Sequence, residues 1–198
     1  GDVYKRQGHK GHPEVIGTLG RHPADSDTNI YLVEDYEDIN KLEINSSEIA
    51  YVTQTTLSVD ETKGLIEALQ VKYPQIIGPS ADDICYATQN RQDAVKQLSL
   101  ECEIVLVIGS KTSSNSNRLK ELAEKCGTKS FLIDDKSDIN IEELKHATSV
   151  GITAGASAPE EIVQEVISFL FPLGYKTVRN LSENNESMTF KLPKELAD

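Results

Sequence analysis

The run Ile104-Val105-Leu106-Val107-Ile108 is the stretch that decides the fold of this chain. Consecutive apolar residues of this kind predict a strand buried on both faces, as strands are in parallel sheets covered by helices. A polar loop over residues 110–117 follows, and then a helix is expected over 116–125. Gly127 is a natural left-handed cap for the end of that helix. This strand–loop–helix order indicates an α/β fold.

The same alternation extends along the chain in both directions. Helices separate the apolar runs, which predicts βαβ units and mainly parallel sheets. Strands are expected over residues 30–33, 49–54, 76–77, 104–108, 130–133 and 149–153, helices over 58–73, 88–98, 116–125, 141–147 and 159–171, and one or two further strands over 176–191. A boundary near residues 79–81 divides the chain into two α/β lobes, 8–81 and 82–170, with a tail over 171–198.

Residues 1–7 do not fit this pattern. Asp-Val-Tyr-Lys-Arg-Gln at positions 2–7 resembles the translation of a transposon-end sequencing adaptor. We therefore expect a cloning or assembly scar here, which is set apart from the reasoning about the fold. A natural tail is the alternative.

Length and charge restrict the classes of function. The chain has 198 residues, enough for one large domain or two small ones, and its formal net charge is −12. That charge argues against a nucleic-acid or anionic-membrane surface, so we expect neither nucleic acid nor a membrane as a partner. No apolar run approaches the roughly 18 to 20 residues that span a bilayer, and no N-terminal pattern indicates secretion.

Three cysteines, Cys85, Cys102 and Cys126, are spread along the chain. An odd number without a Cys-x-x-Cys spacing indicates neither a disulfide framework nor a zinc ribbon, and it suits a reducing cytoplasm. We expect Cys102 and Cys126 to be structural, since free cysteine packs as a small hydrophobe. Cys85 differs, because it follows Ile76-Ile77-Gly78-Pro79 at an expected strand-to-helix junction, where α/β proteins place ligand-binding groups.

Two loops further along have the composition of anion sites. Ser113, Ser114 and Asn115 follow one expected strand, and Ser157 has the same place one βα unit later. Hydroxyls, an amide and free backbone N–H groups at a helix N-terminus can bind a phosphate group. Each loop alone could equally be a helix cap without a ligand. Two such loops beside a cysteine favour a metal or thiol centre that faces a phosphorylated small molecule.

Three polar residues in the first lobe are candidates for binding or proton transfer. His12 and Glu14 stand two apart at the start of an expected helix, where an imidazole and a carboxylate can act together. Ordinary surface polar groups are the alternative for both. Thr55 follows an expected strand and would expose its hydroxyl at the carboxyl end. Simple strand-end capping explains Thr55 equally well.

Six segments together resemble the LytB family of iron–sulfur reductases, which end the methylerythritol phosphate route to isoprenoids. They are GHPEVIGTLG (11–20), TQTTLSVDET (53–62), DDICYATQNRQ (82–92), VIGSKTSSNSNRL (107–119), FLIDD (131–135) and VGITAGASAPE (150–160), and the ending PKEL also fits. The resemblance implies three pseudo-symmetric α/β lobes around a central cluster. This chain would comprise an incomplete second lobe, the third lobe and the tail, and it would lack two of three cluster cysteines.

The resemblance also implies roles for particular residues. Cys85 would ligate one iron of a [4Fe-4S] cluster. Glu14 would deliver the proton that lets the substrate hydroxyl leave as water, and Thr55 would orient Glu14 and the substrate. The diphosphate of the substrate, 4-hydroxy-3-methylbut-2-enyl diphosphate, would be held by His12, Ser113, Ser114, Asn115 and Ser157. The products would be isopentenyl and dimethylallyl diphosphate, with electrons from a reduced ferredoxin or flavodoxin-type donor.

Two other interpretations stay open at this point. The first is an α/β phosphate-binding module without redox chemistry, in which Cys85 is a bystander. The second is that the polypeptide as it stands has no activity, because one thiolate cannot hold a cluster that three normally anchor. We favour the family function combined with an inactive fragment.

Overall fold

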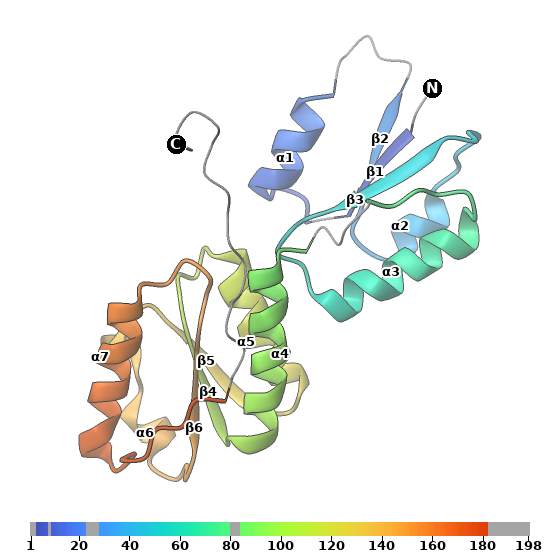
Figure 1. Ribbon diagram of the computed structural model, residues 1–198. Helices are drawn as coiled ribbons and strands as arrows, with labels where there is room; N and C mark the ends of the chain where they lie inside the picture. Colours follow the sequence, from blue (N-terminus) through green and yellow to red (C-terminus); the bar gives the residue numbers. More distant parts are fainter. Residues whose placement is uncertain (1–2, 8, 23–27, 80–83, 182–198) are drawn as a thin grey trace, which may run out of the picture.

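The computed structural model describes residues 3–7, 9–22, 28–79 and 84–181, and it divides them into two α/β lobes (Figure 1). Each lobe has a three-stranded parallel sheet with helices against it. The expected fold class is therefore confirmed. No helix in these described ranges is both long and apolar enough to cross a bilayer.

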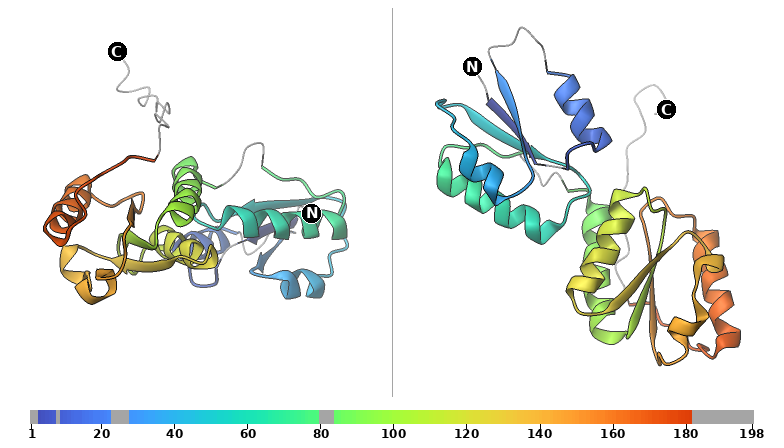
Figure 2. Two further views of the ribbon diagram at one scale, coloured as in Figure 1. Left: turned by 90° about the horizontal axis from the view of Figure 1, so that it is seen from below. Right: turned by 180° about the vertical axis from the view of Figure 1, so that it is seen from behind.

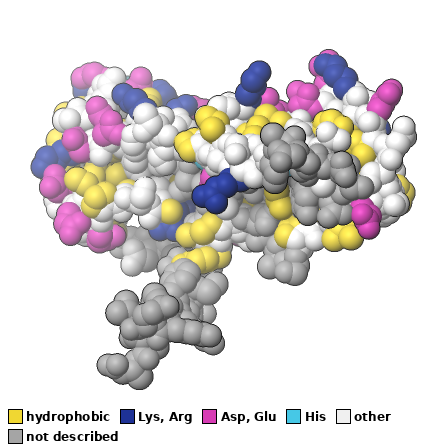
Figure 3. Space-filling view, turned by 90° about the horizontal axis from the view of Figure 1, so that it is seen from above, with side chains coloured by type: hydrophobic (Ala, Val, Ile, Leu, Met, Phe, Trp, Pro, Cys, Tyr) yellow, Lys and Arg dark blue, Asp and Glu magenta, His cyan; other side chains and the backbone are white. Residues whose placement is uncertain are grey.

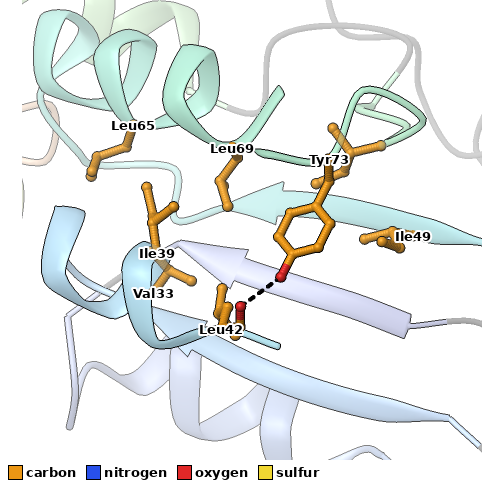
Figure 4. Close-up of a cluster of buried hydrophobic side chains, with 8 residues drawn as sticks. Val33, Ile39, Leu42, Ile49, Leu65, Leu69 and Tyr73 are labelled. Atoms are coloured by element: carbon orange, nitrogen blue, oxygen red, sulfur yellow. Dashed lines mark hydrogen bonds between the residues drawn. The ribbon is translucent and has the colours of Figure 1, made fainter. Parts of the chain in front are cut away.

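The first lobe alternates strands and helices in the strand order β2-β1-β3. Its elements are β1 (Val3–Gln7), α1 (Pro13–Gly20), β2 (Asn29–Val33), α2 (Tyr36–Lys41), β3 (Ile49–Thr53) and α3 (Val59–Lys72). Its core joins β2, β3, α2 and α3 through Val33, Ile39, Ile49, Leu65 and Leu69 (Figure 4). Buried Tyr73 closes this core, and its hydroxyl donates to the Leu42 carbonyl at 2.8 Å.

The backbone of β1 departs from the sequence-based expectation. Residues 1–7 were set apart from the fold, whereas Val3–Gln7 forms the central strand and pairs with both β2 and β3. A strand's ladder consists of main-chain hydrogen bonds, so it does not require the apolar alternation that sequence reasoning looks for. The origin of the segment stays a separate prediction.

The second lobe repeats the topology, with the strand order β5-β4-β6. Its elements are α4 (Tyr86–Glu101), β4 (Ile104–Ile108), α5 (Ser114–Lys125), β5 (Lys129–Ile133), α6 (Ile141–Leu144), β6 (Val150–Ala154) and α7 (Glu160–Leu170), with short 3-10 helices at Lys136–Asp138 and Phe171–Leu173. Every residue of β4 is buried. Val105 and Val107 pack on α4 and α5, whereas Ile104, Leu106 and Ile108 pack toward α6 and α7. The prediction of a strand buried on both faces is confirmed, and the structure adds that this strand is central in its sheet.

Local capping signals are confirmed, and longer-range expectations are less accurate. Ser58 caps α3 by accepting from the Glu61 N–H, and Gly127 has the left-handed φ of +86°. The short helix α2, capped by Asp35, has no counterpart among the expected elements. Ile77 makes only a bridge to Ala50 instead of a strand. Of the expected tail strands, residues 176–181 are irregular, and the remainder lies outside the described residues.

The shared strand order determines where a ligand can bind. From the central strand the chain moves to one neighbour and then crosses to the other side, so the loops after the central and third strands diverge. In open parallel sheets, ligands bind at this switch point, beyond the carboxyl ends of the strands. In the first lobe these loops follow β1 and β3, and in the second lobe they follow β4 and β6.

Helix α3 approaches α4 and α5 where the two lobes meet (Figures 1 and 2), and ion pairs connect the lobes at this junction. Glu61 of α3 pairs with Arg118 at 3.4 Å and with Lys125, both from α5. Lys96 of α4 pairs with Asp60 at 2.8 Å. The hydrogen bond from Lys125, aided by the charges of Arg118 and Lys125, holds the pKa of Glu61 below its ordinary value of 4.5, although partial burial opposes this.

We predict that Glu61→Gln lowers thermal stability at neutral pH and has no effect in acid. A carboxyl whose folded-state pKa is lowered stabilises the fold above its unfolded pKa, and this contribution is lost as pH falls through the folded pKa. The side chain is 48% exposed, so the loss is about 1 kcal/mol or less. Melting curves over that pH range are the measurement. Glu67→Gln, on the same helix and without an ion pair in the described ranges, is the control. An equal effect of Glu61→Gln at all pH values would contradict this account.

Candidate functional site

His12 caps α1 at the end of the loop that follows β1. Its Nδ1 accepts from the Glu14 backbone N–H at 3.3 Å, and Pro13 occupies the first helical position. When Nδ1 is an acceptor, the proton of a neutral imidazole is on Nε2. His12 is half-buried, so the cap aims a ring N–H donor away from the helix.

Glu14 is held by the end of β3. Both of its carboxylate oxygens accept from Thr55: Oε2 from the backbone N–H at 3.0 Å, and Oε1 from the hydroxyl at 2.6 Å. These residues are 41 positions apart in the chain, and both are half-buried. Two hydrogen bonds from one residue orient a carboxylate more firmly than one would. The structure therefore brings together the expected acid and its expected orienting residue.

Cys85 is directly beside that pair. It is the N-cap of α4, its side chain is exposed and makes no cap hydrogen bond, and its backbone N–H donates to the Thr55 carbonyl at 3.1 Å. The positive end of the helix dipole stabilises negative charge on a ligand sulfur at this position. Cys85, Thr55 and Glu14 thus form one connected group.

The other two cysteines lie too far away to share a metal site with Cys85. Cys102 caps the opposite end of α4, about 24 Å along a helix of 16 residues. Burial raises the pKa of its thiol, which suits the expected structural role. Cys126 ends α5 and is exposed, so it does not act as a buried hydrophobe. The described ranges contain no group of three or more His, Cys, Asp or Glu able to hold a metal.

Ser113 and Ser114 begin α5 with their hydroxyl oxygens already accepting. Ser113 Oγ accepts from the N–H and the hydroxyl of Ser116, at 3.3 and 3.0 Å. Ser114 Oγ accepts from Thr56 Oγ1 at 3.0 Å and from Gln54 Nε2 at 3.3 Å. A serine hydroxyl that accepts twice still has its own proton to donate. Both side chains are therefore preorganised as donors.

Asn115 has a buried side-chain amide at the start of α5. Asn115 is 6% exposed, and neither Oδ1 nor Nδ2 has a hydrogen-bond partner among the residues that the structure describes. An unpaired buried amide costs about 1 to 3 kcal/mol. Such a group calls for a ligand, an ion or a water molecule as its partner. It follows the cap of α5 by two residues, as Glu14 follows the cap of α1.

Ser157 lies in the exposed loop that follows β6. The Gly155 N–H donates to the Ile108 carbonyl at 2.8 Å, which fixes the start of this loop at the end of β4. The Ser157 loop therefore begins beside the strand that leads to Ser113. Direct contacts between Ser157 and the other candidates are absent from the described residues.

Gln54 is a site residue that sequence reasoning missed. Its side chain is fully buried, Oε1 accepts from the His9 N–H at 3.1 Å, and Nε2 donates to Thr56 at 2.9 Å as well as to Ser114. It connects the loop after β1 with the start of α5 in the other lobe. The available signal was an amide, both donor and acceptor, in the strand-end sequence Thr53-Gln54-Thr55-Thr56.

Acidic side chains are unevenly distributed over the surface. On the face shown in Figure 3, most Asp and Glu side chains lie toward the two ends, and the middle carries hydrophobic, uncharged and basic side chains. Arg118 is already paired with Glu61 and Glu121, and Lys111 is exposed. The donors at the site itself are accordingly mostly neutral hydroxyl, amide and imidazole groups.

Comparisons with known proteins identify relatives of this chain. A family model described as LytB protein matches residues 5–171. Proteins named 4-hydroxy-3-methylbut-2-enyl diphosphate reductase are 54% identical over 190 residues in Saccharophagus degradans and 55% identical over 192 residues in Chromohalobacter salexigens. Each match covers 96% of this chain and 61% of the relative, so the chain spans about three fifths of their length.

A solved structure has a similar fold over both lobes. The protein described as E-1-hydroxy-2-methyl-but-2-enyl-4-diphosphate reductase from Plasmodium falciparum matches with a TM-score of 0.87 and 32% identity. The match covers 98% of this chain and 60% of that one. Because it extends over both lobes, their relative placement is similar in the two proteins.

We predict that Gln54→Met releases the loop after β1, whereas Gln92→Met does not. Both glutamines are buried, but Gln92 bonds the Leu57 carbonyl and the Val59 N–H instead. Methionine keeps the length of the side chain and removes both polar atoms. Hydrogen exchange at the His9 amide should accelerate about tenfold in Gln54→Met only, as expected for one lost hydrogen bond. Equal His9 exchange in the two variants would contradict this role.

Proposed function

This chain belongs to the LytB family, and from that premise we propose the reaction of a full-length protein carrying it. That protein reduces 4-hydroxy-3-methylbut-2-enyl diphosphate to isopentenyl and dimethylallyl diphosphate, the last step of the methylerythritol phosphate pathway. The observation that carries the proposal is the connected group of Cys85, Thr55 and Glu14 beside donor-rich helix starts. Together these groups supply a metal ligand, a proton donor and an anion site beside the switch points of the two sheets.

The cofactor in this proposal is a [4Fe-4S] cluster. Cys85 fits a ligand, since its sulfur is exposed at the positive end of a helix of 16 residues without a competing cap bond. Cys102 and Cys126 lie at the far ends of α4 and α5, so the other ligands must come from outside the described residues. When bound, the cluster supplies electrons and Lewis acidity. The chain by itself, with one ligand, is accordingly proposed to be inactive.

Donors from both lobes hold the substrate diphosphate in this proposal. His12 Nε2–H, the Ser113 and Ser114 hydroxyls and the Ser157 hydroxyl donate to phosphate oxygens. The diphosphate gives the buried Asn115 amide a partner that the described residues do not supply, which offsets the cost of its burial. Neutral donors let this acidic chain bind an anion without burying additional charged side chains, whose desolvation is costly.

Glu14 transfers the proton that accompanies loss of the hydroxyl. In balanced form, the allylic alcohol takes up two electrons and two protons, the C–O bond breaks, and water leaves. Glu14 in its protonated form donates to the departing oxygen, and Thr55 keeps the carboxyl aimed through its two hydrogen bonds. A fixed donor within reach lowers the barrier by orientation as well as by acidity.

The electron donor and the compartment complete the proposal. A reduced ferredoxin or flavodoxin-type protein supplies the electrons one at a time. A reducing cytoplasm suits the three free cysteines.

We predict that Cys85→Ala abolishes both cluster binding and turnover in the full-length protein. Iron content and the brown absorbance of the purified protein are the measurements. Cys126→Ala is the matched control, because this exposed cysteine lies at the far end of α5 and should leave iron content unchanged. Full iron content and full turnover in Cys85→Ala would show that the assignment of Cys85 as a cluster ligand is wrong.

Replacement of the proposed acid should separate binding from chemistry. Glu14→Gln keeps the shape of the side chain and can still accept from Thr55, so substrate affinity should persist. Turnover should fall by about 10²-fold or more, as for loss of a general acid. Steady-state kinetics and a binding titration distinguish the two effects. Wild-type turnover in Glu14→Gln would remove this residue from the mechanism.

A further inference from the structure

We propose that Ser116 is a positioning residue that sets the spacing and hydroxyl direction of the two loops proposed to bind the diphosphate. The inference rests on the proposed function, since it assigns Ser113 and Ser157 to one ligand. Ser116 is 1% exposed, so it acts through its neighbours and does not contact the ligand.

Ser116 directs the hydroxyl of Ser113. Its Oγ donates to Ser113 Oγ at 3.0 Å, in addition to the backbone N–H at 3.3 Å that forms the ordinary helix cap. The cap alone needs only the N–H. The second bond occupies the remaining acceptor site of the Ser113 oxygen, so the Ser113 proton must point away from the helix.

The same oxygen also separates the loops that follow β4 and β6. A Cβ placed on either Gly109 or Gly155 would approach Ser116 Oγ to within 3.0 Å, closer than real Cβ atoms come. Main-chain bonds fix both glycines, from Gly109 to the Ile133 carbonyl at 2.9 Å and from Gly155 to the Ile108 carbonyl at 2.8 Å. Ser116 Oγ therefore occupies space that a side chain on either Gly109 or Gly155 would need.

Ser116 therefore links two candidate residues, Ser113 and Ser157, that are far apart in the sequence. Ser113 hydrogen-bonds Ser116, and the loop of Ser157 begins at Gly155, against which Ser116 packs. A polar contact and a steric contact from one small side chain thus set both loops. A ligand that needs both serines is sensitive to that side chain, even though it never touches it.

Ser116→Ala in the full-length protein tests the polar contact. We expect the KM for the substrate to rise about tenfold, with kcat within about twofold, because binding is disturbed and the proton donor is not. The Kd of inorganic pyrophosphate should rise in parallel. Ser130→Ala is the control, since Ser130 is equally buried in the same lobe but donates to the Val105 carbonyl at 3.1 Å. Its KM and pyrophosphate Kd should remain at the wild-type values.

A double variant separates the hydrogen bond from the packing. Gly155→Ala should lower the melting temperature, because its methyl group meets Ser116 Oγ. In Gly155→Ala/Ser116→Ala that oxygen is gone, and the two Cβ atoms are an ordinary 3.5 Å apart. We expect the melting temperature to recover in the double variant, while the KM stays as high as in Ser116→Ala.

Several outcomes would overturn the inference. They are an unchanged KM and pyrophosphate Kd in Ser116→Ala, a Ser130→Ala effect of equal size, or recovery of KM together with the melting temperature. A wild-type protein without turnover would instead defeat the proposed function. In that case the ratio of pyrophosphate Kd values between Ser116→Ala and wild type still decides the role of Ser116.

Discussion

The central position of β1 and β4 in their sheets is the constraint on which the remaining structure depends. In each sheet the chain runs from the central strand to a neighbour on one side and then crosses to the other side. The loops after the central and third strands therefore diverge at the carboxyl edge. Seven of the eight candidate residues follow β1, β3, β4 or β6. The eighth, Cys85, is bonded through its N–H to the Thr55 carbonyl after β3.

The two lobes use equivalent positions for different chemistry. His12 and Ser113 each cap the helix after a central strand, and Glu14 and Asn115 each stand two residues further on. The first lobe therefore presents an imidazole and a carboxylate where the second presents a hydroxyl and an amide. Gln54 links the loop before α1 with the first turn of α5 by bonding the His9 N–H and the Ser114 hydroxyl. A repeated scaffold thus carries an imidazole and a carboxyl group in one lobe and neutral hydroxyl and amide groups in the other.

The energetics of the site fit a ligand that brings its own charge. Most of the stability of each lobe comes from apolar layers such as those around β4, where every residue is buried. Asn115 is the exception at the site, because its buried amide has no hydrogen-bond partner in the described part of the chain. Departures of this kind are expected at functional positions, where local stability is given up for binding. An anionic ligand at the start of α5 would give the Asn115 amide a hydrogen-bond partner.

The sequence by itself determined the fold class, the main helices and strands of the second lobe, and the identity of the candidate residues. Those features depend on local physics: the apolar run of β4, the caps at Ser58 and Gly127, and the polar residues at strand ends. Only the tertiary structure decided that Val3–Gln7 is a central strand, because its partners β2 and β3 are distant in the chain. It alone also paired Thr55 with Glu14 across 41 positions and placed Ser116 between Gly109 and Gly155, since such contacts arise from sheet topology, which no local pattern encodes.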